Sequence, residues 1–179
     1  MTDQESYIAA IHENIKLHVY DPAWPAQFHA ERERLLSVLP GAFIAVEHIG
    51  STAVPALMAK PVIDIMAGVE SIASADALAQ RICSSGYCTS AEFNATLADR
   101  KWFMRWANGH RTHHLHLVVQ DGPVWQEHLR FRDLLCAQPA LREQYLQLKS
   151  KLAQAHSNDR EAYTAAKSEF IRSALLDQR

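Results

Sequence analysis

The stretch HIGSTAVPALMAKPVIDIM, residues 48–66, decides how this chain folds around a candidate site. An apolar strand ends at Gly50, which lets the backbone turn tightly. Ser51 and Thr52 follow and offer hydroxyl and N–H donors to an anion. A second apolar strand then carries Asp64, an acid that is costly to bury without a cation or hydrogen-bond donors. The pattern predicts two strands joined by an anion-binding loop, with a carboxylate beside that loop.

Side-chain alternation places this acid and two histidines on a common face of the predicted sheet. In the second strand, Asp64 and Met66 share one face, and apolar side chains occupy the other. In a later strand, His114 and His116 share one face, and leucines occupy the other. We therefore expect Asp64 to lie on an open sheet face, within reach of His116 and close to Gly50. Met66 is expected to face the same open cleft, where an acid in its place would be tolerated.

The remaining elements follow from hydrophobic periodicity, helix caps and turn signals. We expect helices at residues 5–14, 22–38, 74–85, 123–137, 140–156 and 159–176, a brief extended segment at 16–20, and strands at 43–49, 62–69, 101–107 and 113–119. The last two strands are joined by a turn at Asn108-Gly109. Strands early in the chain and helices late in it predict an α+β fold, a mixed sheet flanked by helices with a C-terminal helical segment.

The composition indicates an ordinary globular protein. The chain has 179 residues, 48% of them hydrophobic, and no internal repeat or linker, so we expect a single domain over residues 1–179. The net charge of −2 gives no strong nucleic-acid signal. No apolar run approaches the ~20 residues of a membrane span, and the polar, acidic N-terminus is unlike a signal peptide. With three cysteines and no Cys-x-x-Cys spacing, we expect a cytoplasmic protein with reduced thiols. The sequence carries no indication of the oligomeric state.

Several motifs together resemble the GrpB-like family, which has the nucleotidyltransferase fold and includes members fused to dephospho-CoA kinase. The motifs run from about residue 16 to residue 172 and are Tyr20-Asp21-Pro22-Ala23-Trp24 with Phe28, His48-Ile49-Gly50-Ser51-Thr52-Ala53-Val54-Pro55, Lys60-Pro61-Val62-Ile63-Asp64-Ile65, Arg100 with Phe103, His114-Leu115-His116, Phe131-Arg132-Asp133, and Tyr163 with Lys167. The resemblance implies a metal-bound nucleotide held between the Gly-Ser loop and the acidic strand. It also keeps Lys167 as a candidate to support the site.

The chain departs from the chemistry that this superfamily usually performs. Its active enzymes place two carboxylates two residues apart on the acidic strand and a third on a neighbouring strand, and these acids hold two Mg²⁺ ions. Here Met66 stands in the second position, and the best candidate for the third is His116. Thioether and imidazole are poor ligands for Mg²⁺, so these residues do not supply the usual ligand set for two-metal nucleotidyl transfer.

The histidines leave three interpretations open. His114 and His116, with Asp64 as a third ligand, are a half-site for Zn²⁺, Mn²⁺ or Ni²⁺. Alternatively, His116 acts as a general acid or base or binds a phosphate. The third interpretation is a polar sheet face whose histidines bond to neighbours and water. The possible cofactor is therefore a divalent metal, with Mg, Mn and Zn as candidates.

Basic residues cluster along the chain around the Gly-Ser loop. Lys60 precedes the acidic strand, and Arg100 and Arg105 bracket the next one. With Gly50, Ser51 and Thr52 as a cradle, these cations indicate a phosphate-binding site. Charged residues of the C-terminal helices are expected on solvated faces: Lys149, Lys151, Lys167 and Arg172.

Three functions are consistent with these residues. The first is a nucleotidyltransferase-fold protein that binds a nucleotide or another phosphorylated small molecule, with nucleotidyl or phosphoryl transfer as the reaction that the resemblance implies. In that case Asp64 and His116 are the catalytic pair. The alternative is a non-catalytic ligand-binding or accessory domain that has lost the metal carboxylates. The third, with the least support, is a transition-metal hydrolase built on the histidines.

Overall fold

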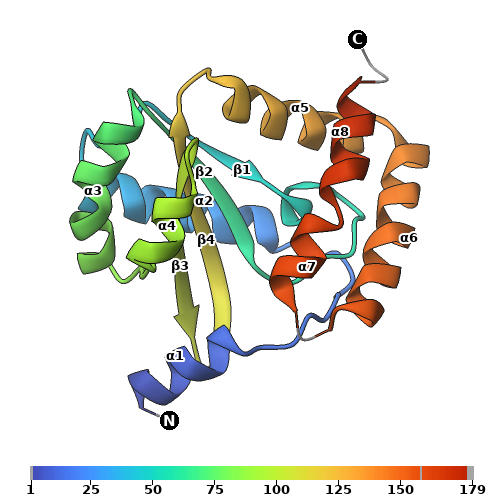
Figure 1. Ribbon diagram of the computed structural model, residues 1–179, viewed down its shortest axis with the longest axis horizontal. Helices are drawn as coiled ribbons and strands as arrows, with labels where there is room; N and C mark the ends of the chain where they lie inside the picture. Colours follow the sequence, from blue (N-terminus) through green and yellow to red (C-terminus); the bar gives the residue numbers. More distant parts are fainter. Residues whose placement is uncertain (1, 158, 177–179) are drawn as a thin grey trace.

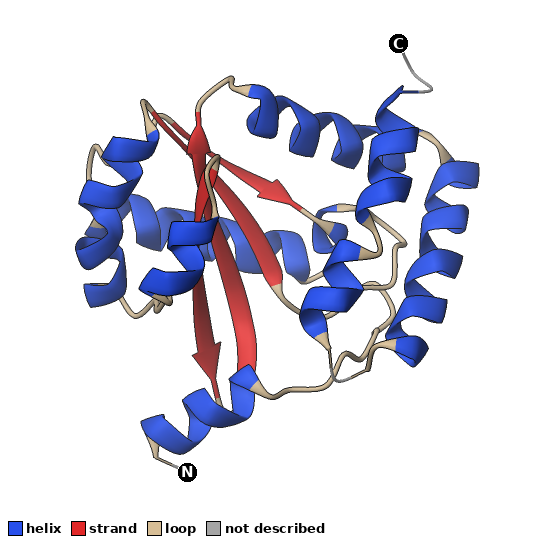
Figure 2. Cartoon of the chain, in the orientation of Figure 1, coloured by secondary structure: helices blue, strands red, loops and turns tan. Residues whose placement is uncertain are grey.

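Four strands form a mixed sheet at the centre of the molecule, in the order β1-β2-β4-β3 (Figures 1 and 2). The computed structural model describes residues 2–157 and 159–176. The strands are β1 (Ala45–Ile49), β2 (Ile63–Val69), β3 (Arg100–Ala107) and β4 (His110–Val119). β2 runs parallel to β4, and the two edge strands, β1 and β3, run antiparallel to their neighbours.

Helices surround this sheet, so the expected α+β fold with a C-terminal helical segment is confirmed. They are α1 (Asp3–Ile11), α2 (Trp24–Val38), α3 (Ile72–Ser84), α4 (Ala91–Thr96), α5 (Pro123–Ala137), α6 (Pro139–Ala155), α7 (Arg160–Ala165) and α8 (Ser168–Leu176), with a short 3-10 helix, η1 (Ser51–Ala53). None of the helices in the described ranges is both long enough and apolar enough to cross a membrane.

Local sequence signals placed most elements within a few residues of their observed ends. The turn between β3 and β4 is the two residues Asn108 and Gly109, both with positive φ (52° and 80°), as a tight hairpin requires. Residues 16–20 form only an isolated bridge, from His18 to Ala59. The short helix α4 was not expected. The single helix expected at 159–176 is wrong, since the structure has two helices, α7 and α8.

One face of the sheet is packed against α2 and α3 and holds the main core. The alternating side chains of β2 and β4 supply its centre, including Ile63, Ile65, Leu115 and Leu117, all at most 1% exposed. Burying this alternating set fixes the register, because a one-residue slip would turn every side chain to the opposite face. The polar set of the same strands is therefore held on the second face.

Helix α5 covers part of that second face, and this corrects the expectation for Met66. Met66 is 0% exposed and packs with Ile49, Val118 and Trp125 in a small apolar cluster beneath α5. It shares the face of Asp64, as the alternation predicts, but it does not face an open cleft. Strand alternation fixes the face of a side chain and cannot tell which helix will lie over it.

The C-terminal helices stand beside the uncovered part of the second face (Figure 1). Leu135 of α5 and Tyr145 of α6 pack with Val54 and Leu57 of the loop between β1 and β2. Because the loop carries Ser51, this third cluster brings α6 against the Gly-Ser segment. The candidate site thus lies between the open half of the sheet and the C-terminal helices.

Candidate functional site

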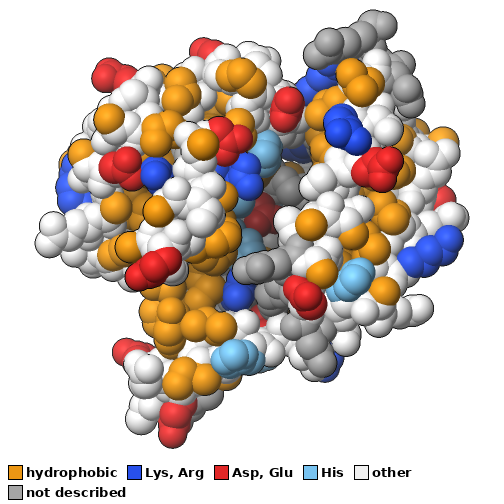
Figure 3. Space-filling view, in the orientation of Figure 1, with side chains coloured by type: hydrophobic (Ala, Val, Ile, Leu, Met, Phe, Trp, Pro, Cys, Tyr) orange, Lys and Arg blue, Asp and Glu red, His pale blue; other side chains and the backbone are white. Residues whose placement is uncertain are grey.

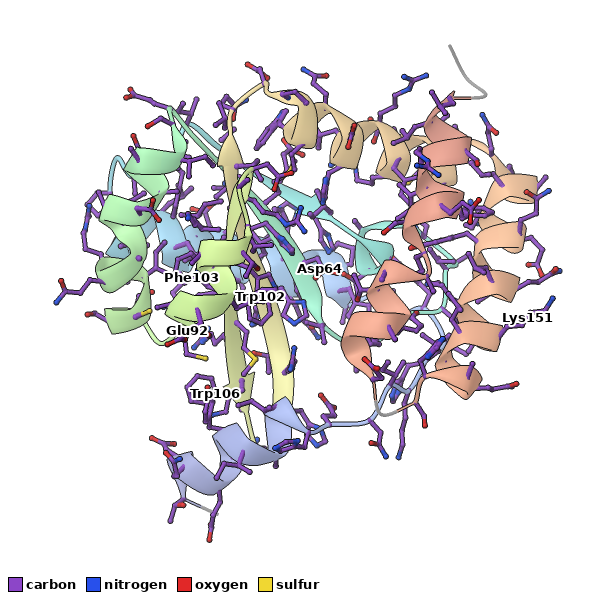
Figure 4. The ribbon with its side chains drawn as sticks, viewed as in Figure 1. Asp64, Glu92, Trp102, Phe103, Trp106 and Lys151 are labelled. Carbon is purple, nitrogen blue, oxygen red and sulfur yellow. The ribbon has the colours of Figure 1, made fainter. Side chains whose placement is uncertain are left out.

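Asp64, His114 and His116 come together on the open sheet face. In the parallel pairing of β2 and β4, Asp64 is aligned with His114, and Met66 is aligned with His116. Asp64 Oδ1 lies 2.9 Å from His114 Nδ1, and one ligand atom from each of the three side chains lies within 4.8 Å of the other two. In Figure 4, Asp64 points from β2 toward the C-terminal helices.

Gly50 makes room for the carboxylate. Its φ is 71°, in the region that favours glycine, and a Cβ built at this position would overlap Asp64 Oδ2. The carboxylate therefore lies directly against the backbone of the Gly-Ser loop, as expected from the sequence.

Charges near Asp64 keep it ionised. Burial opposes ionisation, but the hydrogen bond from His114 and the positive charge of Lys60 outweigh it and hold the pKa of Asp64 well below its usual range. For His116 burial dominates and lowers the pKa to about 3, so its ring is neutral at pH 7 and carries a lone pair.

Two ring nitrogens in this group lack hydrogen-bond partners. Within the described residues, His114 Nε2 and His116 Nδ1 are buried and bonded to nothing. Buried polar atoms are usually satisfied, because leaving one unpaired costs roughly 1–3 kcal/mol. Such a pair of free nitrogens beside a carboxylate is suited to binding a cation or exchanging a proton.

Lys149 of α6 reaches the Gly-Ser loop from the opposite side. Its Nζ lies 3.0 Å from Ser51 Oγ, also donates to the carbonyl of Met58, and lies 5.2 Å from the centroid of the Tyr145 ring. The residue is 1% exposed, so the expectation that it lies on a solvated face is wrong. Burial, together with the nearby charge of Lys167, lowers its pKa to about 7.

Two further lysines approach the same region across one aromatic ring. Lys60 Nζ and Lys167 Nζ lie 5.2 Å and 4.3 Å from the centroid of the Tyr163 ring. Lys167 is half-buried, so it is not on a fully solvated face, and burial lowers its pKa to about 8. The ammonium groups of Lys60, Lys149 and Lys167 and the carboxylate of Asp64 are thus close enough for their charges to interact.

Two of the expected phosphate ligands are committed to other contacts. Thr52 is 1% exposed, and its hydroxyl donates to the carbonyl of Val62 and accepts from His48 Nε2. Arg105 lies on the packed face of the sheet, where its Nη1 bonds to Glu31 at 2.7 Å. Arg105 therefore does not belong to the candidate site, and the Thr52 side chain holds the loop in place.

Arg100 remains at the edge of the site. Its position in β3 opposite Val118 puts it on the same face as His116, and it contributes to the electrostatics of His116 and His128. Its side chain is 36% exposed, with Nη1 3.4 Å from Asp99 Oδ1, so it remains accessible to a ligand.

The surface is hollowed where these groups meet. Figure 3 shows a cleft between the part formed by the sheet and α4 and the part formed by the C-terminal helices, with histidine and acidic side chains at its bottom. Lys151, two residues after Lys149 on α6, points outward instead (Figure 4).

Lys149 is the main residue of the cleft that the sequence reasoning missed. A signal was present, since Lys149 follows Tyr145 by four residues and shares the apolar face on which Leu141, Leu148 and Leu152 repeat. A lysine within an apolar helical stripe indicates a buried charge that needs a partner, and here Ser51 provides one.

Comparisons with known proteins agree with the fold. A family profile described as "GrpB protein" matches residues 14–176. A crystal structure of the conserved protein GrpB from Enterococcus faecalis superimposes with a TM-score of 0.76 at 36% identity, covering 91% of this chain and 99% of that one.

Some of the similar curated proteins are named UPF0157 or GrpB proteins, and others are named dephospho-CoA kinases. UPF0157 protein YqkA of Bacillus subtilis is 36% identical over 160 residues, which are 89% of this chain, and the chain spans about half of YqkA (46%). Glutamate-rich protein GrpB of Alkalihalophilus pseudofirmus is 32% identical, over 83% of this chain and 86% of that one. A dephospho-CoA kinase of Mycolicibacterium paratuberculosis is 32% identical over 182 residues, covering 89% of this chain and 45% of the kinase.

Proposed function

The chain belongs to the GrpB family, and from this premise we propose that its cleft binds a nucleotide or another phosphorylated small molecule. The observation that carries the proposal is the buried ammonium group of Lys149, bonded to Ser51 next to the carboxylate of Asp64. Lys60 and Lys167 add two more positive charges nearby.

A phosphate group fits the electrostatics of this cleft. Like charges in a poorly solvated region repel one another, and this repulsion contributes to the low pKa of Lys149. An anion in the cleft would reduce this repulsion and accept hydrogen bonds from the half-buried amines of Lys60 and Lys167. The buried Lys149 would act on the anion through its charge and through Ser51. Lysine binds phosphate as a point charge, and the Ser51 hydroxyl supplies a further donor.

The relatives support a nucleotide-related role. In some of them the family domain shares a chain with dephospho-CoA kinase, an enzyme whose name denotes a phosphorylated, nucleotide-containing substrate. For the cleft itself, nucleotidyl or phosphoryl transfer is the reaction class that we propose if the protein is an enzyme. We also propose that it works in the cytoplasm, where Cys83, Cys88 and Cys136 would remain reduced, as they are free thiols here.

A second candidate, a non-catalytic ligand-binding domain, is favoured by one observation. Met66, in the position of the second metal carboxylate of active nucleotidyltransferases, is fully buried beneath α5. A chain with this packing has no place for the second acid. The phosphorylated ligand would then be bound without being transformed.

The test is a thermal-shift screen with nucleotides and coenzyme A precursors. A ligand that binds only the native state stabilises it by roughly 2.7 kcal/mol at ~100 times Kd, which such a screen detects. We expect Lys149→Met to abolish the shift, because methionine has a similar length and no charge. The matched control is Lys151→Met on the exposed side of the same helix, which should keep the shift.

Two results would contradict the proposal. The first is that none of the phosphorylated compounds stabilises the unchanged protein. The second is that Lys149→Met and Lys151→Met respond equally to a ligand that does bind. If a ligand binds, incubation followed by mass spectrometry of the nucleotide separates the two candidates, since only an enzyme changes it.

A further inference from the structure

We propose that Asp64, His114 and His116 bind a single divalent transition-metal ion. The inference is independent of the phosphorylated ligand, because it concerns only these side chains and their immediate surroundings. One carboxylate and two imidazoles are a ligand set that suits Zn²⁺, Mn²⁺, Co²⁺ and Ni²⁺.

The three side chains are already gathered for this role. They come from the two central, parallel strands, whose register is fixed by the core on the opposite face. One ligand atom from each lies within 4.8 Å of the other two. Ligand bonds to such ions are about 2.0–2.2 Å long, so small side-chain rotations would bring all three atoms into one coordination sphere.

The unpartnered ring nitrogens are the independent evidence for a bound ion. His114 Nε2 and His116 Nδ1 are buried, and within the described part of the chain nothing hydrogen-bonds to them. A structural role in the sheet would be expected to satisfy at least one of them. A metal ion uses the lone pair of an imidazole nitrogen, and a buried nitrogen without a hydrogen-bond partner is available to supply one.

The surroundings of the three side chains limit their movement. Asp64 lies against Gly50, whose missing side chain leaves the space that the carboxylate occupies. The His114 ring packs against the Trp102 ring, with centroids 5.2 Å apart. Side chains that are already restricted lose less conformational entropy when they bind a metal ion, so the entropic cost of binding is smaller.

The same surroundings do not fit the two Mg²⁺ ions that the nucleotidyltransferase resemblance implies. Mg²⁺ requires hard oxygen ligands, and Asp64 is the one carboxylate in the group. Met66 cannot be exchanged for an acid without disrupting the cluster with Val118 and Trp125. A single ion with two nitrogen ligands replaces the two-ion arrangement.

The test is a titration of the chelator-treated 179-residue chain with Co²⁺ in the absence of any phosphate compound. We expect one ion per chain, visible absorption bands of nitrogen-coordinated Co²⁺, displacement by Zn²⁺, and no displacement by millimolar Mg²⁺. His116→Ala and Asp64→Asn should each weaken Co²⁺ binding at least ~100-fold, beyond the ~10–100-fold cost typical of outer-shell changes. His110→Ala, an exposed histidine on the same strand, should bind Co²⁺ like the unchanged protein.

A measurement on the unchanged protein keeps the proposal falsifiable if a variant does not fold. Nitrogen-15 spectra of the imidazoles should show Zn²⁺ shifting the signals of His114 and His116 and leaving His110 in place. Unaltered signals of His114 and His116 would overturn the proposal, as would Co²⁺ binding that survives His116→Ala in a folded variant. Since no phosphorylated compound is present, either result leaves the Lys149 test of ligand binding unaffected.

Discussion

The two faces of the sheet each hold a carboxylate, and the two are satisfied very differently. Glu31 of α2, on the packed face, is 4% exposed and accepts hydrogen bonds from Arg34, Arg105 and Tyr87 at 2.7–2.9 Å. Within the described residues, Asp64 on the open face accepts one hydrogen bond, from His114. Glu31 is surrounded by the donors that a buried carboxylate needs, whereas the group around Asp64 includes two nitrogens without partners.

The difference separates a structural charge from a binding charge. A buried carboxylate whose donors all come from its own chain gains nothing from a ligand and stabilises the fold as it is. A carboxylate with an incomplete set of partners leaves hydrogen-bonding and coordination capacity for something else. Both acids have a lowered pKa, so the pKa alone would not distinguish them. The hydrogen-bond partners of each acid distinguish the two.

The largest effect is expected for Met66→Asp, which tests how far the open face extends. Because position 66 is sealed beneath α5, we expect the free energy of unfolding to fall by about 5 kcal/mol through lost packing and a buried, unpaired acid. Met66→Leu, which keeps the volume, should cost less than about 1.5 kcal/mol. Urea denaturation measures both. A stable Met66→Asp protein with strengthened Mg²⁺ binding would show that the cleft continues beneath α5.

The next prediction concerns the free energy of unfolding when a carboxylate is replaced by the matching amide on each face of the sheet. Glu31→Gln should cost about 3 kcal/mol, since it leaves two guanidinium groups beside an uncharged amide. Asp64→Asn should cost the metal-free protein about 2 kcal/mol, because the amide oxygen still accepts from His114 but the favourable interaction with the charge of Lys60 is lost. Glu33→Gln, on the exposed side of α2, is the control and should change stability by less than about 0.5 kcal/mol. Equal costs for Glu31→Gln and Asp64→Asn would remove the distinction between the faces.

The smallest effect is the pH dependence that His48 gives to the packed face. Burial lowers the pKa of His48 to about 4, and its ring stacks on Phe28 and bonds to Thr52. The unfolded chain, with a histidine pKa near 6.5, takes up this proton first as the pH falls. Stability is therefore complete above pH 6.5 and declines between pH 6.5 and 4. The full shift corresponds to about 3 kcal/mol, which solvent screening of this half-buried ring reduces to roughly 1–2 kcal/mol. The decline should be smaller in His48→Gln, measured by urea denaturation across the pH range; an unchanged decline would assign it to other groups.

The sequence was sufficient to predict the four strands and the faces on which Asp64 and the histidines lie, but not the strand order that places β2 beside β4. Both predictions follow from local rules, namely the alternation of side chains along strands and the turn chemistry of Asn108-Gly109. The predicted boundaries of β1 and β2 differ from the observed ones by at most two residues, because their apolar runs end at glycine or polar residues.

The surroundings of the site were not predictable in the same way. The cover over Met66, the approach of Lys149 and the separation of α7 from α8 all depend on how helices dock on a finished sheet. Docking depends on the shape of the whole molecule, which single-strand and single-helix patterns do not contain. Arg105 is a further example. It lies on the same face of the sheet as Phe103, as the alternation predicts, but that face is the packed one. Arg105 therefore bonds to Glu31 and lies outside the cleft.

The contact between Gly50 and Asp64 restricts the order in which these two residues can be lost during evolution. A side chain at position 50 would have to overlap the carboxylate of Asp64, and the backbone there is in a conformation that favours glycine. A relative can therefore lose the acid and keep the glycine, but it cannot lose the glycine and keep the acid where it is. Ordered by descent, GrpB sequences should show glycine disappearing only in lineages from which the acid has already gone. The presence of the acid, rather than of the glycine, is then the feature that marks descendants retaining the ancestral site.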